Sequence, residues 1–293
     1  MSFEKCYLQI INSLKGVEVV KDFPIGKYSR YKTGGYCDIA IFPKSEEEFK
    51  NAVSIVRGIC PLEIVGAGTN LLVSDGGFQG AVILTEKMLS TKQSGNLYVA
   101  ESGVKLSSVI RDLALNSLSG LEFAVGIPAS VGGAVCMNAG CYGKSVGDYV
   151  RYVVTENGTL TKGDCEFGYR TSRFLKEKTA IIKVCFALNP SEPEVIEEKL
   201  KSYSNMRRNP KGKSCGSVFK NEGYFAGRVI DECGLKGYCK GGARVSEEHA
   251  NFIIASDGAT SQNIYDLIKT IKEKVYEKRQ IVLSEELVYL GKF

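Results

Sequence analysis

The sequence lacks several residue types on which common active sites depend. It contains no tryptophan and a single histidine, His249, in 293 residues. Multi-histidine zinc sites are therefore excluded, and a Ser-His-Asp hydrolase would have to use that one imidazole. A metal ion would need thiolate or carboxylate ligands, and no tight cluster of them occurs in the sequence. We predict no metal site.

Cysteine is present, but not at the spacings that its common functions require. The ten cysteines include no Cys-x-x-Cys pair, and the closest pairs are Cys136/Cys141 and Cys233/Cys239. Free cysteine behaves as a small buried hydrophobe, and a long cytosolic chain keeps its thiols reduced. We therefore predict packed, unpaired thiols rather than disulfides.

Long apolar runs and a strong charge imbalance are also missing. No run approaches the roughly 18 apolar residues of a membrane helix. The N-terminal MSFEKCYLQI has an early glutamate and no apolar core, unlike a secretory signal. The formal charge of +5 is small and dispersed, which does not favour nucleic acid but suits small anionic ligands. We expect a cytoplasmic monomer with no membrane or nucleic-acid partner.

Hydrophobic periodicity in the first half predicts alternating helices and strands. Residues 45–58 are typical of an amphipathic helix, with Ser45 and Glu48 spaced as a capping box. A strand LEIV follows, then strands AVILT and LYVAES. A second helix is predicted over residues 106–117, with Gly120 beyond it as a terminator.

From about Val150 the pattern changes to β-strands. A hairpin is predicted around Asn157-Gly158, and AIIKVCFAL alternates as a half-buried strand should. The segment NPSEPE predicts a linker, because its prolines interrupt both helices and sheets. Helices are expected from about Glu194 and from near Ser261. The whole is a mixed α+β chain with a boundary near residues 190–200.

Two glycine-rich loops are candidates for ligand binding. In VGAGTNLLVSDGG, Gly66 and Gly68 allow a sharp turn that presents backbone amides, and Thr69 and Asn70 add polar side chains. Such a loop can bind a pyrophosphate. The alternative is a tight β-turn, because Leu71–Val73 continue as a strand and not as the helix of a dinucleotide-binding fingerprint.

The second loop, GIPASVGGAVCMNAGCYG, is denser in glycine and has only small residues around Pro128. Side chains this small cannot fill a core, but they let the backbone lie against a large ligand. A bound dinucleotide has the required size and charge. The two loops together therefore predict a dinucleotide site better than either loop alone.

These loops resemble the two flavin-cradling motifs of the UDP-N-acetylenolpyruvoylglucosamine reductases, the MurB family. The segments FGYRTSRF, SCGSVFKN, AGRVIDECGLKGYCKGGARVS, HANFIIA and EELVYLG follow in the order of that family. The resemblance extends from SRYKTGG to Gly291. No additional insertion is apparent in the last third, which resembles the shorter, type II branch.

The resemblance implies an α+β, vanillyl-alcohol-oxidase/PCMH-type FAD-binding fold of two subdomains plus a C-terminal α+β substrate-binding domain. The implied divisions are 1–84 (with an N-terminal helix), 85–193 and 194–293. It also implies non-covalent FAD and NADPH as hydride donor. The implied reaction converts UDP-N-acetylenolpyruvoylglucosamine to UDP-N-acetylmuramate in peptidoglycan synthesis. Hydride from reduced FAD would attack the vinyl carbon.

The family match also implies roles for individual residues. Ser217 would donate the proton to the carbon beside the carboxylate, with Lys220 or an arginine stabilising its alkoxide. Arg170 would support the substrate carboxylate, and Glu286 would assist the enolate. The cofactor-binding residues implied are Gly66, Ala67, Gly68, Thr69, Asn70, Leu71, Gly126, Ile127, Pro128, Ala129, Ser130, Gly132, Gly133, Ala134, Asn138 and Gly140. The substrate-binding residues implied are Tyr169, Arg207, Lys220 and Asn221.

Some positions depart from the family pattern. Val288 stands where the C-terminal motif has arginine, Glu285 competes with Glu286 for the motif glutamate, and Glu222 replaces a proline. The segment 207–214 is shortened. All four departures fall in the predicted substrate domain. Two alternatives therefore stay open: a related flavoprotein with another substrate or weak catalysis, and a non-catalytic nucleotide-sugar binding protein.

Overall fold

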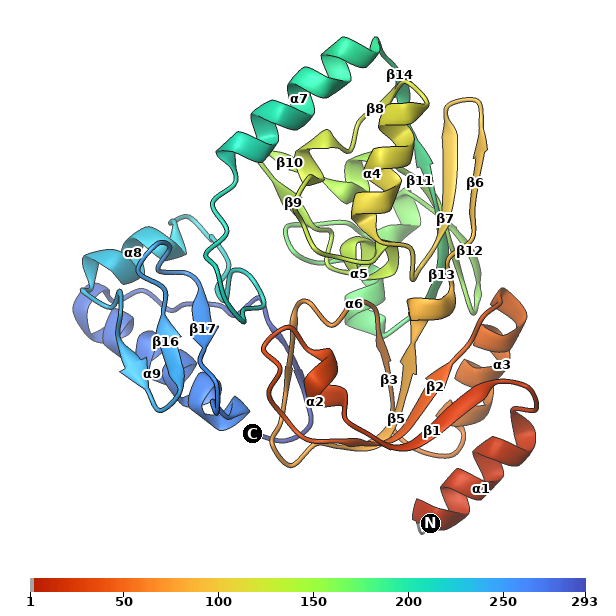
Figure 1. Cartoon of the computed structure of the whole chain (residues 1–293), viewed down its shortest axis with the longest axis horizontal. Coiled ribbons are helices and arrows are strands. Elements are labelled where there is room, and N and C mark those ends of the chain that lie inside the picture. Colours follow the sequence, from red (N-terminus) through yellow and green to blue (C-terminus); the bar gives the residue numbers. More distant parts are fainter. Residues whose placement is uncertain (1–2) are drawn as a thin grey trace. The chain divides into compact units, whose positions relative to one another are not determined.

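The computed structural model describes residues 3–293, which form two compact units. Unit 1 comprises the described residues up to Lys21, Ile39–Ala67 and Gly80–Arg207. Unit 2 comprises Asp22–Asp38, Gly68–Gln79 and Arg208–Phe293. The chain can be followed through both units by colour in Figure 1. Residues 1 and 2 of the first predicted subdomain lie outside the described residues.

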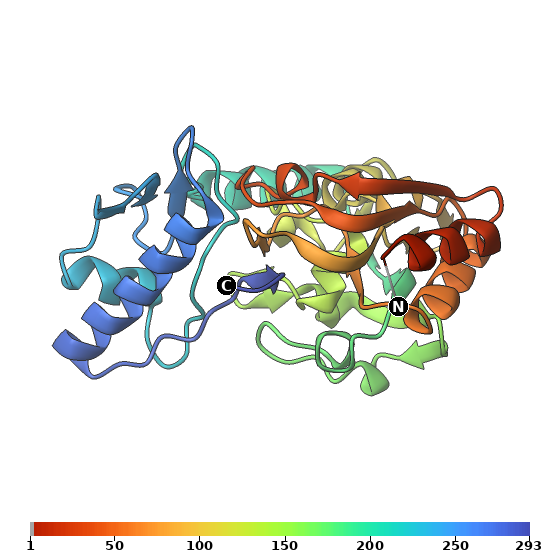
Figure 2. The ribbon, with the colours of Figure 1, turned by 90° about the horizontal axis from the view of Figure 1, so that it is seen from below.

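The first sheet, whose strands lie mainly in unit 1, has the order β1–β2–β5–β3. Its strands are β1 (Glu18–Phe23), β2 (Cys37–Phe42), β5 (Phe78–Leu84) and β3 (Leu62–Val65). Helices α1 (Phe3–Ser13) and α3 (Glu46–Arg57) lie beside each other in Figure 2 and share a core with this sheet, through residues such as Ile10, Phe49 and Ile83. The helix predicted over 45–58 is confirmed, and Ser45 caps it by accepting from the Glu48 amide.

The second sheet of unit 1 is antiparallel, with the order β12–β11–β13–β7–β6. Its strands are β12 (Gly158–Thr161), β11 (Val150–Thr155), β13 (Ile181–Ala187), β7 (Leu97–Glu101) and β6 (Thr91–Ser94). Helices α4 (Leu106–Leu115), α5 (Val131–Cys136) and α6 (Arg173–Glu177) contribute residues to its core. The hairpin predicted at Asn157-Gly158 is confirmed by the pairing of Thr155 with Gly158.

Helix α7 (Pro193–Met206) belongs to unit 1 rather than to the C-terminal domain. Its apolar face, with Ile196 2% exposed and Leu200 and Tyr203 partly buried, packs on the core that includes α4 and η2 (Glu122–Ala124). The division thus falls after Arg207, whereas the sequence placed it at residue 194. The prolines of NPSEPE led to the wrong boundary, because Pro193 is the first residue of α7, a helix position that proline tolerates.

Unit 2 is built around the sheet β15–β16–β17 and two helices (Figure 1). These elements are β15 (Cys239–Lys240), β16 (Ala243–Val245), β17 (Ile253–Ala255), α8 (Ala226–Glu232) and α9 (Ser261–Arg279). The apolar stripe predicted on the last helix is confirmed, since its members are all buried: Ile264, Leu267, Ile268, Ile271 and Val275. This stripe forms the centre of the core of unit 2.

Two N-terminal segments complete unit 2, although the sequence assigned them to the first subdomain. They carry α2 (Ile25–Tyr28) and β4 (Leu71–Val73), and β4 pairs in parallel with β18 (Val288–Leu290). The Asp75 carboxylate accepts from the amides of Ser261 and Gln262, each at 2.9 Å. A carboxylate at this helix end stabilises α9, which explains why the segment folds with unit 2.

The remaining elements are short: η1 (Thr85–Lys87), β8 (Leu118–Ser119), β9 (Gly140–Cys141), β10 (Lys144–Ser145), η3 (Val146–Tyr149), η4 (Gly163–Cys165) and β14 (Asn189–Pro190). All ten cysteines are free thiols, as predicted. Across residues 3–293, no helix has the length and apolar character required to cross a bilayer.

Candidate functional site

The two glycine-rich loops meet within unit 1. A Cβ built on Gly66 would lie 2.2 Å from the hydroxyl oxygen of Ser130 and 3.7 Å from the amide nitrogen of Gly133. Ser130 in turn accepts a hydrogen bond from the Gly133 amide at 3.3 Å, which caps α5. Only glycine allows this approach at position 66. The two loops therefore lie next to each other at Gly66 and Ser130, and their contribution to one ligand site stays a prediction.

The first loop carries a run of backbone donors that the protein does not use. The amides of Ala67, Gly68, Thr69 and Asn70 donate no hydrogen bond to any residue within 3–293. Gly68 has a φ of 63°, a left-handed conformation that turns the chain sharply. Consecutive amides without a protein acceptor suit a pyrophosphate, so this loop fits the phosphate-bearing part of a dinucleotide.

Glycines of the second loop serve mainly to pack the loop on its own unit. A Cβ at Gly132 would lie 2.7 Å from Cβ of Ser102, and one at Gly140 would lie 2.4 Å from the carbonyl oxygen of Lys144. These contacts refine our expectation that the glycines chiefly clear space for a ligand. By contrast, residues Gly126 and Pro128 are exposed and could lie against a cofactor.

Asn138, predicted as a cofactor contact, uses its carboxamide within the protein. Its Oδ1 accepts from the Gly147 amide at 2.9 Å, and its Nδ2 donates to the Gly168 carbonyl at 2.8 Å. The residue is 5% exposed. Its side chain therefore connects the second glycine loop to the turn that carries Tyr169 and Arg170, while its contact with a cofactor stays a prediction.

Arg170 occupies a strained turn between Gly168 and Thr171. Its φ of 53° is left-handed, which is uncommon for a residue with a side chain and concentrates at functional sites. The guanidinium donates to the Gly140 carbonyl at 2.6 Å and lies 5.1 Å from the centre of the Tyr169 ring. The predicted pair Tyr169 and Arg170 thus lies beside the second glycine loop.

Arg207, predicted to bind substrate, lies against the second glycine loop of unit 1. Its Nη2 contacts the Cys141 sulfur at 3.1 Å and the Phe123 carbonyl at 3.4 Å, while its Nε is buried without a hydrogen-bond partner. A Cβ on Gly126 would meet its Cδ at 2.6 Å. Burial raises the pKa of Cys141, and the nearby Arg207 opposes that rise. The thiol therefore stays neutral despite its cationic neighbour.

In unit 2, the segment around Ser217 begins with a sharp reversal. Gly216 has a φ of 86°, and its amide donates to the Ser214 hydroxyl at 3.3 Å. Ser217 follows, half-buried and paired with Phe252 through an isolated antiparallel bridge. Its hydroxyl makes no hydrogen bond with the protein in the described chain. A half-exposed hydroxyl at a fixed backbone position can meet a ligand.

The two adjacent glutamates near the C-terminus have different environments. The Glu285 carboxylate accepts from Lys272 at 2.6 Å and from the Tyr289 hydroxyl. Burial is the main cause that raises the pKa of Tyr289, and the Glu285 carboxylate raises it further. The phenol therefore stays protonated and donates. Both oxygens of Glu285 are therefore engaged within unit 2.

Glu286 lies next to the Ser217 segment through its backbone. Its amide donates to the Val218 carbonyl at 2.8 Å, and its carbonyl accepts from Nδ2 of Asn70 at 2.9 Å. Three residues predicted from separate motifs, Asn70, Ser217 and Glu286, are thus brought together in unit 2. The Asn70 side chain supports the protein here, in addition to any cofactor contact through its amide.

Lys220 and Asn221 continue the same segment. The Lys220 amide donates to the Ser284 carbonyl at 2.8 Å, and Asn221 Oδ1 accepts from the Ala226 amide at 2.9 Å. The structure contains no hydrogen bond between the Lys220 ammonium and Ser217. Lys220 is therefore near Ser217 in the sequence, but its ammonium does not hydrogen-bond the Ser217 hydroxyl.

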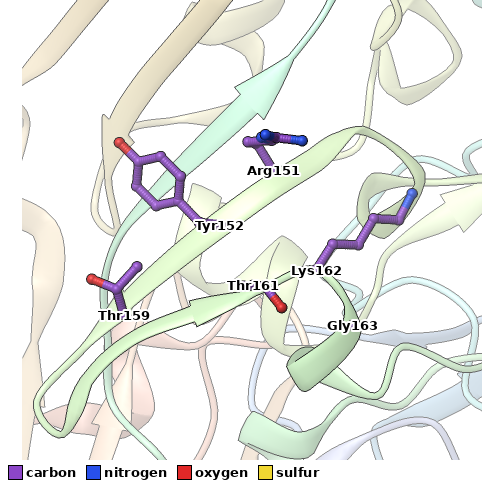
Figure 3. Close-up of a pocket in the computed structure, with 6 residues that line it drawn as sticks. All are labelled: Arg151, Tyr152, Thr159, Thr161, Lys162 and Gly163. Carbon is purple, nitrogen blue, oxygen red and sulfur yellow. The ribbon is translucent and has the colours of Figure 1, made fainter.

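A separate surface hollow of about 460 Å³ lies along the β11–β12 hairpin of unit 1. Figure 3 shows its lining side chains, among them Arg151 and Tyr152 from β11 and Lys162 just after β12. It contains none of the residues predicted from the motifs.

Comparisons with known proteins show which family this chain belongs to. The FAD binding domain family matches residues 37–164, and the family described as UDP-N-acetylenolpyruvoylglucosamine reductase, C-terminal domain, matches 208–290. The UDP-N-acetylenolpyruvoylglucosamine reductase of Streptococcus pneumoniae (strain 70585) is 38% identical over 293 residues, covering 97% of each chain. This chain belongs to the MurB family. A second MurB relative, from Caldicellulosiruptor bescii, is 40% identical over 290 residues, covering 95% of this chain and 92% of its own.

Solved structures agree with the MurB assignment. The MurB structure from Thermus caldophilus matches with a TM-score of 0.82 at 32% identity, covering 94% of this chain and 99% of that one. The glucose dehydrogenase Phl p 4.0202 matches 64% of this chain and 44% of its own with a TM-score of 0.51 at 15% identity, which shows the fold alone. The predicted α+β, vanillyl-alcohol-oxidase/PCMH-type FAD-binding fold is confirmed.

Proposed function

We propose that this MurB family member reduces the enolpyruvyl ether of UDP-N-acetylenolpyruvoylglucosamine to the lactyl ether of UDP-N-acetylmuramate, a step of peptidoglycan synthesis. The observation that carries the proposal is 38% identity to a reductase of that name over 97% of both chains. We further propose that the enzyme acts as a cytoplasmic monomer. Ten free thiols suit a reducing compartment.

The cofactor is FAD, and the loop from Gly66 to Asn70 would hold its pyrophosphate. The unused amides of Ala67–Asn70 support this role, as does the contact between Gly66 and Ser130. The exposed residues Gly126 and Pro128 would lie along the cofactor. When bound, FAD would supply the hydride-transfer chemistry that links NADPH to the vinyl group of the substrate.

Arg170 would bind the substrate carboxylate. Negative charge grows on that carboxylate as the vinyl carbon gains a hydride, and a fixed guanidinium stabilises the charge where it develops. The left-handed turn and the hydrogen bond to Gly140 already hold Arg170 before substrate binds. Such preorganisation avoids the free energy of reorienting the side chain during the reaction.

Ser217 would hold the proton that completes the reduction. The proton passes from its Oγ to the carbon beside the carboxylate, which turns the planar enolate carbon into the tetrahedral carbon of the lactyl ether. The half-buried hydroxyl without a protein partner is consistent with this role. Glu286 would assist the enolate from the neighbouring segment, while Tyr169, Arg207, Lys220 and Asn221 would contribute to substrate binding.

An anaerobic half-reaction experiment tests this function. The purified protein should be yellow, NADPH should bleach its flavin, and UDP-N-acetylenolpyruvoylglucosamine should restore the colour with formation of UDP-N-acetylmuramate. Bleaching without reoxidation by this nucleotide would instead support a related flavoprotein with another substrate. A colourless protein that binds the nucleotide would support a non-catalytic binding protein.

A further inference from the structure

Asn251 is a buried residue of unit 2 within the segment HANFIIA. It is 3% exposed, and its carboxamide forms two hydrogen bonds with the backbone of a residue far away in the chain. Its Oδ1 accepts from the Phe219 amide at 2.9 Å, and its Nδ2 donates to the Phe219 carbonyl at 2.8 Å. Its own carbonyl accepts from the Val218 amide at 2.8 Å. Asn251 thus binds both residues that follow Ser217.

The side chain of Asn251 takes the place of a neighbouring strand. In a regular antiparallel ladder, one residue exchanges an amide donor and a carbonyl acceptor with the residue opposite. Phe219 is bridged to Glu285 on one side, and on the other side its own amide and carbonyl make that exchange with the Asn251 carboxamide. On either side of Phe219, Ser217 is bridged to Phe252 and Lys220 donates to Ser284. Phe219 is 1% exposed, so its backbone groups have no access to water. Without Asn251 they would be buried and unpaired.

The backbone of Asn251 is itself fixed. Its amide donates to Nδ1 of His249 at 3.2 Å, and the Phe252 amide donates to the His249 carbonyl at 3.0 Å. The Ser246 hydroxyl accepts from the His249 amide at 3.3 Å. Hydrogen bonds therefore fix the turn from Ser246 to Phe252 at both ends. Because Asn251 belongs to this turn, its two hydrogen bonds fix the backbone of Phe219 as well.

We propose that Asn251 is a positioning residue for Ser217. It holds Val218 and Phe219 in register, so that the Ser217 hydroxyl, which makes no hydrogen bond of its own within residues 3–293, keeps the position required for proton transfer. The inference rests on the proposed function, because it assumes that Ser217 is the proton donor. Asn251 acts through the backbone and does not touch the substrate.

The test uses the FAD-loaded enzyme and three variants. Asn251→Ala removes both hydrogen bonds, and Asn251→Asp keeps the shape and an acceptor but loses the donor to Phe219. The matched control is Asn263→Ala, because Asn263 also bonds backbone amides in unit 2, those of Gly242 and Thr260, without touching the Ser217 segment. Each variant is measured for thermal unfolding, flavin reduction by NADPH and flavin reoxidation by the enolpyruvyl nucleotide.

We expect both Asn251 variants to slow reoxidation by about 10- to 100-fold, the range for a catalytic group misplaced by roughly 1 Å. NADPH-driven reduction should change less than about twofold, since it does not use Ser217. Asn263→Ala should lower the unfolding temperature without slowing reoxidation. Equal slowing by Asn263→Ala would overturn the proposal, because loss of stability alone would then explain the effect.

A double variant shows whether Asn251 acts through Ser217. Residues that act as a unit are non-additive, so Ser217→Ala with Asn251→Asp should be no slower than Ser217→Ala alone. If the rate losses of the two single variants multiplied in the double variant, the inference would be overturned, while Ser217 would remain the proton donor. If Ser217→Ala alone reoxidised at the wild-type rate, the donor assignment would fail together with the inference. If Asn251→Ala does not fold, Asn251→Asp carries the comparison.

Discussion

Gly66 and Ser130 approach so closely that a Cβ on Gly66 would lie 2.2 Å from the Ser130 hydroxyl oxygen. This contact joins two loops that are distant in the sequence. Ser130 also caps α5 by accepting from Gly133, so one hydroxyl links the first loop to the start of the helix in the second. The arrangement explains why glycine is needed at position 66 even before a cofactor is considered.

Gly66→Ala should therefore lower FAD occupancy. The added methyl group must push Ser130 away, which separates the loops and disturbs the amides of Ala67–Asn70. The ratio of flavin absorbance to protein in the purified variant measures this. Gly58→Ala is the matched control in unit 1, because its Cβ would meet only the Ile55 carbonyl at 3.6 Å and its backbone is αR. Full flavin occupancy in folded Gly66→Ala would contradict the role of the loop.

Arg170→Lys tests the carboxylate contact. Lysine keeps the charge but loses the planar fork that pairs with a carboxylate through two hydrogen bonds, and it also loses the geometry that reaches the Gly140 carbonyl. We expect reoxidation by substrate to slow by about 10-fold or more, roughly the value of one charge-assisted hydrogen bond. Flavin reduction by NADPH should survive. Equal damage to both half-reactions would indicate a folding role instead.

His249 gives the stability of unit 2 a pH dependence. Burial lowers the pKa of His249 below its usual value near 6.5, and the positive charge of Lys236 acts in the same direction. The folded state therefore holds its proton less tightly than the unfolded state. Stability should be intact above about pH 6.5 and should fall as the pH decreases through the lowered pKa. Protonation of Nδ1 would also remove the acceptor for the Asn251 amide.

Thermal unfolding across this pH range checks the prediction. His249→Gln cannot gain a proton, so its unfolding temperature should decrease less than that of the wild type on acidification. Parallel curves for the two proteins would show that other groups account for the acid sensitivity. Because the Asn251 amide donates to Nδ1 of His249, protonation of His249 should also disturb Asn251. Flavin reoxidation should therefore slow on acidification more in the wild type than in His249→Gln.

Features encoded by local periodicity could be predicted from the sequence. The stripe from Ile264 to Val275 and the hairpin at Asn157-Gly158 depend on spacing and turn chemistry within a few residues. The family motifs likewise indicated the two glycine loops and the Ser217 segment. In each case the information is contained within one continuous stretch of chain.

Features that depend on long-range packing could not be predicted. Asp75 joins unit 2 because its carboxylate caps α9, whose first residue is Ser261, and nothing near Asp75 indicates that partner. Asn251 lies in the HANFIIA segment that the family order indicated, but that segment does not show that its side chain bonds the backbone of Phe219, 32 residues away in the chain. Asn138 was assigned by motif to the cofactor, whereas its partners Gly147 and Gly168 appear only in the folded chain.

Reoxidation of the reduced flavin by UDP-N-acetylenolpyruvoylglucosamine in Ser217→Ala and Ser217→Cys tests the account most directly. Flavin binding and reduction by NADPH should remain close to wild type, because neither needs the hydroxyl. Reoxidation should slow by roughly 10² to 10⁴ in Ser217→Ala, the range for a missing general acid. Ser217→Cys should retain more activity, because its thiol is a stronger acid, and in deuterated buffer it should place deuterium beside the product carboxylate. Reoxidation of Ser217→Ala at the wild-type rate would contradict the account.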